Sequence, residues 1–300
     1  MPENKAKPNS GCPVHDSSTL SSRPKRSVVD YSRNSVRSRL IAMDVPNGDA
    51  SLASGYRSAQ QRARVVTEAW IKRHGYCLAC EGDHLTQTKS NTQARDFECD
   101  KCGHPYELKS SLNPLGSRIV DGSYAAMMHR IQTSTVPSFL LLQYSLTWNV
   151  VSLRAIHHAL ITSEAIEIRK ALAITARRAG WVGCNILLGG IPPEGRIPLI
   201  VDGIAVPRDD CRIKFARAEK LAGFSPETRG WAAAVLTRLH CLKNERFALS
   251  DAYAFEEELK HLYPENRNIR AKIRQQLQVL RDAGLVAFEA RGIYKLIGGG

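Results

Sequence analysis

Apolar residues recur at helical spacing between residues 59 and 74. Ala63, Val66, Ala69 and Trp70 fall on one side of this segment, whereas the other positions are mostly polar or charged. A helix buries such a stripe against a core and leaves its opposite face in water. The pattern therefore predicts an amphipathic helix over residues 59–74.

After this helix the pattern changes to short apolar or β-branched runs, which are typical of strands. Two of these runs, residues 95–98 and 106–109, flank a tight Cys-x-x-Cys turn and predict a hairpin. Further along the chain, Ser123 is placed to cap a helix over residues 124–133, and the glycine-containing segment 175–185 is expected to form a loop. The remaining predicted strands are 138–142, 149–153 and 197–201.

Glycine and proline interrupt the pattern between residues 202 and 228, and we place a domain boundary there. Beyond it, the pattern predicts three helices, a helix stop at Gly284 and two short strands. This order is typical of a winged helix. The predicted helices are 231–240, 249–262 with Ser250 as N-cap, and 268–281, and the predicted wing strands are 285–288 and 292–296.

The third of these helices has an apolar stripe of Ile269, Ile273, Leu277 and Leu280, with basic and glutamine side chains elsewhere. In a winged helix this element enters the major groove of DNA, where glutamine can pair with adenine and arginine with guanine or phosphate. A solvated helix face has the same composition, so that alternative stays open. The candidate DNA-binding residues are Arg270, Lys272, Arg274, Gln275, Gln276 and Gln278.

Composition and charge narrow the class of protein. The 300 residues suffice for two modest domains, 43% are hydrophobic, and the net charge of +13 suits a polyanionic partner such as DNA. No apolar run approaches the roughly 18 residues that span a bilayer, and no signal-peptide pattern opens the chain, so we expect a soluble cytoplasmic protein without a membrane partner. The N-terminal segment is rich in serine, arginine and proline, and this composition predicts a basic, disordered tail over residues 1–55. Met43 is an alternative initiating residue within it.

Four cysteines form two Cys-x-x-Cys pairs, Cys77 with Cys80 and Cys99 with Cys102, separated by eighteen residues. Two such pairs at this spacing are typical of one four-thiolate zinc site. A redox pair would instead be expected to open a helix, and His104 is not needed as a ligand because four thiolates fill a tetrahedral shell. A closed shell stabilises the fold and leaves no position for catalysis, so the predicted zinc site is structural.

Two carboxylates and a lysine surround the second cysteine pair. Ten residues separate Asp96 from Glu107, and Lys109 follows on the same predicted strand. Residues two apart on a strand share a face, so Glu107 and Lys109 point the same way and Asp96 on the partner strand can face them. This is the residue set of the PD-(D/E)xK nucleases, in which two carboxylates hold Mg²⁺, the metal activates phosphate and water, and the lysine stabilises charge. Glu68 on the first helix adds a further candidate carboxylate.

From about Tyr56 to Lys295, the chain resembles the family of DpnI-type methyl-directed restriction endonucleases. Arg95 stands where the PD motif has proline, and the basic tail has no counterpart in the family. The segments that carry the resemblance are 63–68, 95–97, 107–110, 121–128, 175–185 and 273–282.

The resemblance implies an α/β fold in which a PD-(D/E)xK nuclease core with an inserted four-cysteine zinc site, residues 56–222, precedes a winged helix at 226–297. It implies a type II enzyme, dependent on Mg²⁺ and containing Zn²⁺, that cuts double-stranded DNA at GATC when the adenine is N6-methylated. Trp181 falls where the family has a tryptophan near the methylated bases, although an ordinary buried tryptophan remains the alternative. By position, the resemblance assigns catalysis to Asp96, Glu107 and Lys109, magnesium to Asp96 and Glu107, and zinc to Cys77, Cys80, Cys99 and Cys102.

Rival interpretations stay open at this point. A non-enzymatic regulator built from a zinc ribbon and a winged helix would not need the two carboxylates and the lysine, and a repair or mobile-element nuclease on the same fold would read another sequence. Two reading domains on one chain suit a monomer. Phosphate contact and solvated surface are equally open for Arg177, Arg178, His129 and Arg130.

Overall fold

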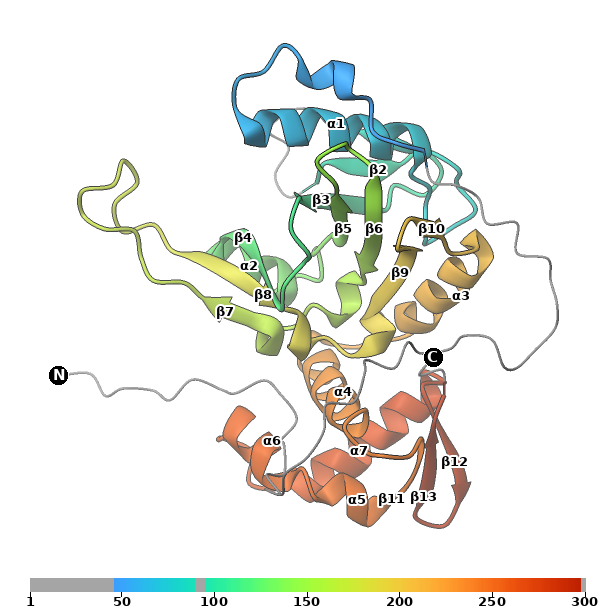
Figure 1. Ribbon diagram of the computed structural model, residues 1–300. Helices are drawn as coiled ribbons and strands as arrows, with labels where there is room; N and C mark the ends of the chain where they lie inside the picture. The colour runs from blue at the N-terminus through green and yellow to red at the C-terminus, as the bar shows by residue number, and fades with distance from the viewer. Residues whose placement is uncertain (1–45, 90–94, 298–300) are drawn as a thin grey trace, which may run out of the picture.

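The computed structural model describes residues 46–89 and 95–297 (Figure 1). The predictions of a disordered tail and of an alternative start at Met43 concern residues 1–45, which lie outside this range. Residues 46–55, which we also expected in the tail, lie instead on the N-terminal domain. The short 3-10 helix η1 (Ala50–Ala53) packs on the first α-helix, and the carbonyl of Pro46 accepts a hydrogen bond of 2.7 Å from Trp70 Nε1.

A seven-stranded sheet forms the centre of the N-terminal domain, in the order β1-β2-β3-β5-β6-β9-β10. Neighbouring strands are antiparallel except for β3 and β5, which run parallel. β5 is buried at its first five positions because both faces of the sheet are covered there. The strands are β1 (Leu85–Gln87), β2 (Phe97–Cys99), β3 (Pro105–Ser111), β5 (Ser138–Tyr144), β6 (Val150–Ile156), β9 (Arg196–Val201) and β10 (Ile204–Ala205).

The helix predicted over residues 59–74 is confirmed as α1 (Ala59–His74), and Ser58 is its N-cap. Its buried face includes Val66 and Trp70, which belong to the predicted apolar stripe. α1 packs against β1 and β3 and lies along the sheet in Figure 1. The start of α1 is thereby brought close to the strand that carries Glu107 and Lys109.

A second sheet has three strands in the order β4-β8-β7. Between β7 and β8, residues 169–182 form an arm that projects from the molecule in Figure 1. The segment 175–185 is a loop only up to Val182, because the residues after it pair with β4 and β7 as a strand. As predicted, Ser123 caps a helix, α2 (Tyr124–Gln132). The strands are β4 (Arg118–Ser123), β7 (Ile166–Ile168) and β8 (Gly183–Leu187).

The stretch between residues 202 and 228, in which we place the domain boundary, contains a further helix, α3 (Arg208–Glu219). Its buried residues Cys211, Phe215 and Ala218 recur at helical spacing, but charged side chains dominate the segment and hide that stripe. α3 packs against β9 and the short helix η5 (Pro193–Gly195). The connection between the domains therefore shrinks to the few residues between α3 and the next helix.

The C-terminal domain has the predicted order of helices and wing, with corrections. The first helix, α4 (Pro226–Leu239), begins before Trp231, and the wing gains a third strand. The predicted helix 249–262 is broken in two, and Ser250 is not its N-cap, because the first of the two helices already begins at Leu249 and has Ala248 as its N-cap. The amide of Ala248 donates to the side chain of Asp251 at 2.8 Å. The other elements are β11 (Arg246–Ala248), α5 (Leu249–Tyr253), α6 (Glu256–Leu262), α7 (Ile269–Asp282), β12 (Val286–Ala290) and β13 (Ile293–Leu296).

One apolar core crosses the boundary between the two domains. It joins Met127 and Ile161 of the N-terminal domain to Leu236 and Leu277 of the C-terminal domain. α4 packs on three short helices of the N-terminal domain, η2 (His158–Leu160), η3 (Ser163–Ala165) and η4 (Leu188–Gly190). Within the described part of the chain, none of the helices has both the length and the apolar character needed to cross a membrane.

Candidate active site and four-cysteine cluster

β2 and β3 form the predicted hairpin and pair antiparallel, with Phe97 opposite Tyr106. The second Cys-x-x-Cys pair makes its turn. The amide of Cys99 donates to the carbonyl of His104 at 3.0 Å, and the amide of Gly103 donates to the carbonyl of Cys99 at 2.8 Å. Gly103 has a φ of 72°, where side chains are strained. This turn sets the register of β2 against β3.

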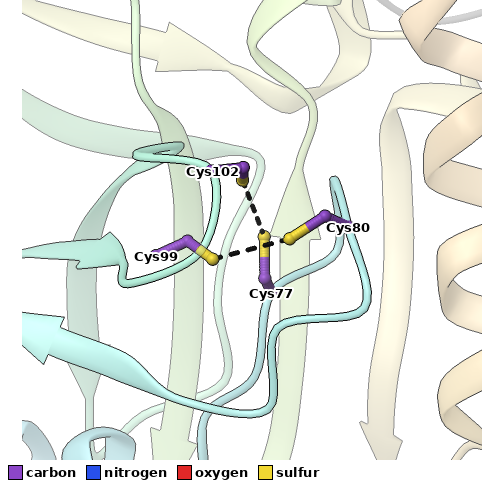
Figure 2. A group of neighbouring side chains, drawn as sticks. All are labelled: Cys77, Cys80, Cys99 and Cys102. Atoms are coloured by element: carbon purple, nitrogen blue, oxygen red, sulfur yellow. Dashed lines mark hydrogen bonds between the residues drawn. The ribbon is translucent and has the colours of Figure 1, made fainter.

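Four cysteine sulfurs meet at the turn (Figure 2). The Sγ atoms of Cys77 and Cys102 are 3.7 Å apart, and those of Cys80 and Cys99 are 3.6 Å apart. Zn–S bonds of about 2.3 Å in a tetrahedron would separate the sulfurs by roughly 3.8 Å, so the cluster fits one zinc ion. His104 lies outside the cluster, as expected.

Neighbouring groups support the cluster without competing for ligand positions. The amide of Gly82 donates to Cys80 Sγ at 3.3 Å. A Cβ atom at Gly82 would lie only 2.7 Å from Cys99 Sγ, so this position needs glycine. Arg212 of α3 donates to the carbonyl of Cys77 at 3.1 Å. The cluster thus links the segment after α1, the hairpin and α3.

Asp96, Glu107 and Lys109 line one open cavity of about 620 Å³ beside the hairpin. Asp96 Oδ2 accepts a hydrogen bond of 2.8 Å from the amide of Leu108, which fixes this carboxylate to β3. Lys109 Nζ lies 2.6 Å from Glu107 Oε1. The structure therefore brings together the three side chains that strand parity places on one face.

A carboxylate that we did not predict joins this group. Asp121 on β4 is buried, and its Oδ1 lies 2.7 Å from Lys109 Nζ. Burial acts to lower the pKa of Lys109, but Glu107 and Asp121 outweigh it and raise that pKa. Burial raises the pKa of Glu107, Lys109 opposes this effect, and the carboxylates of Asp121 and Asp96 add to it. No spacing in the sequence links Asp121 to the three predicted residues, because it comes from the other sheet.

Glu68 lines the same cavity, but both of its oxygens have partners. Its Oε1 accepts from Arg64 Nε at 2.7 Å, and its Oε2 accepts from Gln87 Nε2 at 2.7 Å. Glu68 would therefore have to exchange a hydrogen bond in order to bind a cation.

α7 presents a polar face to solvent. Arg270 Nε donates to Glu256 on α6 at 2.6 Å, and Arg274 donates to the hydroxyl of Tyr253 on α5 at 2.7 Å. These partners hold the two guanidinium groups at the surface of the domain. The predicted DNA-binding residues that are exposed are Arg270, Arg274, Gln275 and Gln278.

Two candidate DNA-binding residues on α7 do not share this face. Gln276 is 0% exposed and cannot contact DNA in this structure, which corrects the prediction. Its position on the helix lies on the same side as Ile273, so the core encloses it. Lys272 is only 18% exposed, since its ammonium lies over the ring of Trp231 and 3.3 Å from Glu227 on α4.

Trp181 lies in the connection between β7 and β8, next to β8, and is half-buried. Its ring covers Gly183, where a Cβ atom would come within 2.8 Å of the ring. The guanidinium of Arg178 lies 4.7 Å from the ring centroid. Among the candidate phosphate contacts, Arg177, Arg178 and His129 are exposed and Arg130 is half-buried.

The fold and the site together are consistent with an α/β nuclease joined to a helix-turn-helix domain. Residues 46–224 match the model of the DpnI family, described as the Dam-replacing family. Residues 227–296 match the model of the Dam-replacing HTH domain. The chain belongs to this DpnI, Dam-replacing family of restriction nucleases and carries its DNA-binding domain.

Proposed function

We propose that the protein is a methyl-directed type II restriction endonuclease that hydrolyses double-stranded DNA at GATC sites whose adenine is N6-methylated. The observation that carries this proposal is the convergence of Asp96, Glu107 and Lys109 on one cavity in a chain of the DpnI family. Mg²⁺ is the proposed catalytic cofactor, and Zn²⁺ is the proposed occupant of the four-cysteine cluster.

Asp96 and Glu107 offer the carboxylate oxygens that a hard divalent cation prefers. When bound, Mg²⁺ supplies Lewis acidity at the scissile phosphate. The amide of Leu108 holds one oxygen of Asp96, so this carboxylate is oriented before the cation arrives. Lys109 places a positive charge beside the carboxylates, where it orients the attacking water or stabilises charge that develops on the phosphate.

Recognition of methylated adenine requires more than one contact surface on the protein, because burial of a methyl group contributes little binding free energy. Burial of one methyl contributes about 0.8 kcal/mol, or about fourfold in affinity, and the two methyls of a fully methylated site give roughly fifteenfold. We propose that Trp181, whose apolar ring can pack on a methyl group, and the exposed face of α7 each read the site, so that their preferences multiply. Two reading surfaces on one chain suit a monomer.

Plasmid DNA from hosts with and without adenine methylation tests this function. With Mg²⁺, the protein is expected to cut only methylated plasmid, and Lys109→Ala is expected to bind that plasmid without cutting it. Lys220→Ala removes an exposed lysine just after α3 and should keep cleavage, which makes it a matched control. Wild-type protein that binds methylated DNA but never cuts it would support the alternative, a non-enzymatic zinc-ribbon and winged-helix regulator.

Substitutions in the full chain test the two reading surfaces, because the core shared by the domains makes isolated domains unsuitable. Trp181→Ala and Gln275→Ala should each lower the ratio of affinities for methylated and unmethylated duplexes by roughly three- to fivefold, and the double variant should lose most of it. If one substitution alone removes the entire ratio, the proposal of two surfaces is wrong.

A further inference from the structure

Lys109 is held by two carboxylates that come from different sheets. Its Nζ lies 2.6 Å from Glu107 Oε1 on its own strand and 2.7 Å from Asp121 Oδ1 on β4. The side chain of Asp121 is only 4% exposed, so this contact is shielded from water. The ring of Phe139 lies 5.7 Å from the ammonium and closes another side.

We propose that Asp121 is a positioning residue of the active site, which holds the Lys109 ammonium in place while Glu107 binds a divalent cation. This inference rests on the proposed nuclease function and adds to it a residue that lies outside the predicted PD-(D/E)xK set.

The Glu107 carboxylate cannot bind the Lys109 ammonium and a divalent cation equally well at the same time. A cation held by the carboxylates of Asp96 and Glu107 would compete with Lys109 for Glu107 and would repel the ammonium. A lysine side chain is a flexible four-carbon stem with a point charge, so it loses its position unless another group holds it. Asp121 approaches from a separate sheet, and its contact with Lys109 can persist while Glu107 rearranges.

The elements around Asp121 fix its own position. Asp121 pairs with Cys184 of β8, and the register of the two strands shifts between Asp121 and Ser123. Ser123 accepts a hydrogen bond of 3.4 Å from the amide of Ala126 and so caps α2. Asp121 is thus held between a strand pair and the start of a helix, and such supports fix a side chain more firmly than a loop does.

Asp121 is poorly placed to bind the cation itself. Its Oδ1 is occupied by Lys109, and its Oδ2 lies 3.9 Å from the thiol of Cys184 in a buried setting. A hydrated divalent cation keeps several waters and needs an accessible carboxylate. Substitution of a cation ligand would raise the Mg²⁺ concentration needed for half-maximal cleavage, whereas substitution of a positioning residue would leave it unchanged.

Asp121→Asn in the full chain separates these roles, because asparagine keeps the size and one acceptor oxygen but removes the charge. The single-turnover rate on a methylated duplex should fall by about 10- to 100-fold. The half-saturating Mg²⁺ concentration, and the DNA affinity with Ca²⁺ in place of Mg²⁺, should stay at wild-type values. Asp121→Glu should recover part of the lost rate. Asp209→Asn, an exposed substitution on α3, should keep the wild-type rate.

Labelling of Lys109 by an amine-reactive reagent gives a readout that does not depend on cleavage. With Mg²⁺ present, mass spectrometry of the Lys109 peptide should show faster labelling in Asp121→Asn than in Asp209→Asn or the wild type. Unchanged labelling, an unchanged cleavage rate or a raised Mg²⁺ requirement would each overturn the role of Asp121. A wild-type protein that never cuts would instead overturn the nuclease function, and the labelling would still decide whether Asp121 holds Lys109.

Discussion

Among single residues, His157 is a buried histidine whose pKa is lowered by burial, so its ring is neutral near pH 7. Its ring is fully buried, with its centroid 4.1 Å from that of Phe215, and its Nδ1 accepts from the amide of Ala159 at 3.1 Å. The proton of the neutral ring therefore sits on Nε2, which lies 3.0 Å from Glu219 Oε2. Because a metal ligand must offer a free nitrogen lone pair, the group formed by His157, His158 and Glu219 is not arranged to bind a metal.

This buried histidine should make the protein less stable in acid. Burial lowers the pKa of His157 from 6.5 to about 4. The unfolded ring takes up a proton first as the pH falls, so its contribution to stability is complete above pH 6.5 and is lost as the pH falls towards the folded pKa. At about pH 5 the loss should be on the order of 2 kcal/mol, measured by urea unfolding against a neutral reference.

Two variants check that His157 causes this loss. His157→Asn should show a smaller change in the free energy of unfolding between neutral pH and pH 5 than the wild type does. His261→Asn, an exposed substitution on α6, should keep the wild-type change. Equal pH dependence in all three proteins would contradict the prediction.

The sequence predicts the contacts of some site residues and not of others, depending on how local those contacts are. Asp96, Glu107 and Lys109 sit on one hairpin, so alternation along its strands is enough to bring them together. Asp121 reaches Lys109 only through the packing of one sheet against another. Gln276 is buried because its side of α7 faces the core. Its polar side chain would by itself predict an exposed position, so the sequence misleads here.

Among the elements, the β2–β3 hairpin carries both a cysteine pair and the carboxylates proposed to be catalytic. Pairing of Phe97 with Tyr106 fixes the distance between Asp96 and Glu107. If the four-cysteine cluster holds zinc as proposed, Cys99→Ser should lose that zinc and lower cleavage by about 100-fold or more, although the cysteines do not line the cavity.

Zinc content by plasma mass spectrometry and cleavage of methylated plasmid check this coupling. Cys211→Ser, at a buried cysteine outside the cluster, should keep both zinc and cleavage. Full cleavage by a folded, zinc-free protein would contradict the expected coupling between the cysteine cluster and the cavity.

Helices with a clear apolar stripe are the elements that the sequence predicts best. The bounds of α1 agree with the expected residues 59–74, and those of α7 differ from 268–281 by one residue at each end. The sequence does not predict α3, because its many charged residues obscure the helical spacing of its apolar residues. The break between α5 and α6 falls at Ala254 and Phe255, which carry no local signal of a helix end, so tertiary packing determines it.

At the scale of the whole molecule, the two domains meet along α4. The carboxylate of Glu164 on η3 lies against Gly230, where a Cβ atom would come within 2.8 and 2.9 Å of its oxygens. Arg229, only 5% exposed, donates to Ser134 Oγ at 3.0 Å. The apolar pattern predicts a helix over residues 231–240, but it does not reveal that α4 packs on the other domain.

These contacts predict that the protein unfolds as one cooperative unit and that Gly230→Ala destabilises it. Alanine normally stabilises a helix interior by about 1 kcal/mol relative to glycine. Because Oε2 of Glu164 is buried, its carboxylate has little room to move aside, so overpacking should outweigh this gain and leave a net loss of about 1–2 kcal/mol. Calorimetry should show a single transition that moves to lower temperature in Gly230→Ala.

A matched control comes from Gly223, where an added Cβ atom has no neighbour within 4 Å. Gly223→Ala should therefore leave the transition temperature nearly unchanged. Two well-separated transitions in the wild type would show that the domains are not coupled through α4. A more stable Gly230→Ala would show that the Glu164 side chain moves aside.

The core that continues from Ile161 into Leu236 and Leu277 also limits how this enzyme can be engineered. Joining its C-terminal DNA-binding domain to the nuclease domain of a relative would divide that core and leave mismatched apolar surfaces on both domains. Changing the sequence preference should instead work through the solvent-facing side chains of α7, such as Gln275 and Gln278, which can be diversified in a library without disturbing the join.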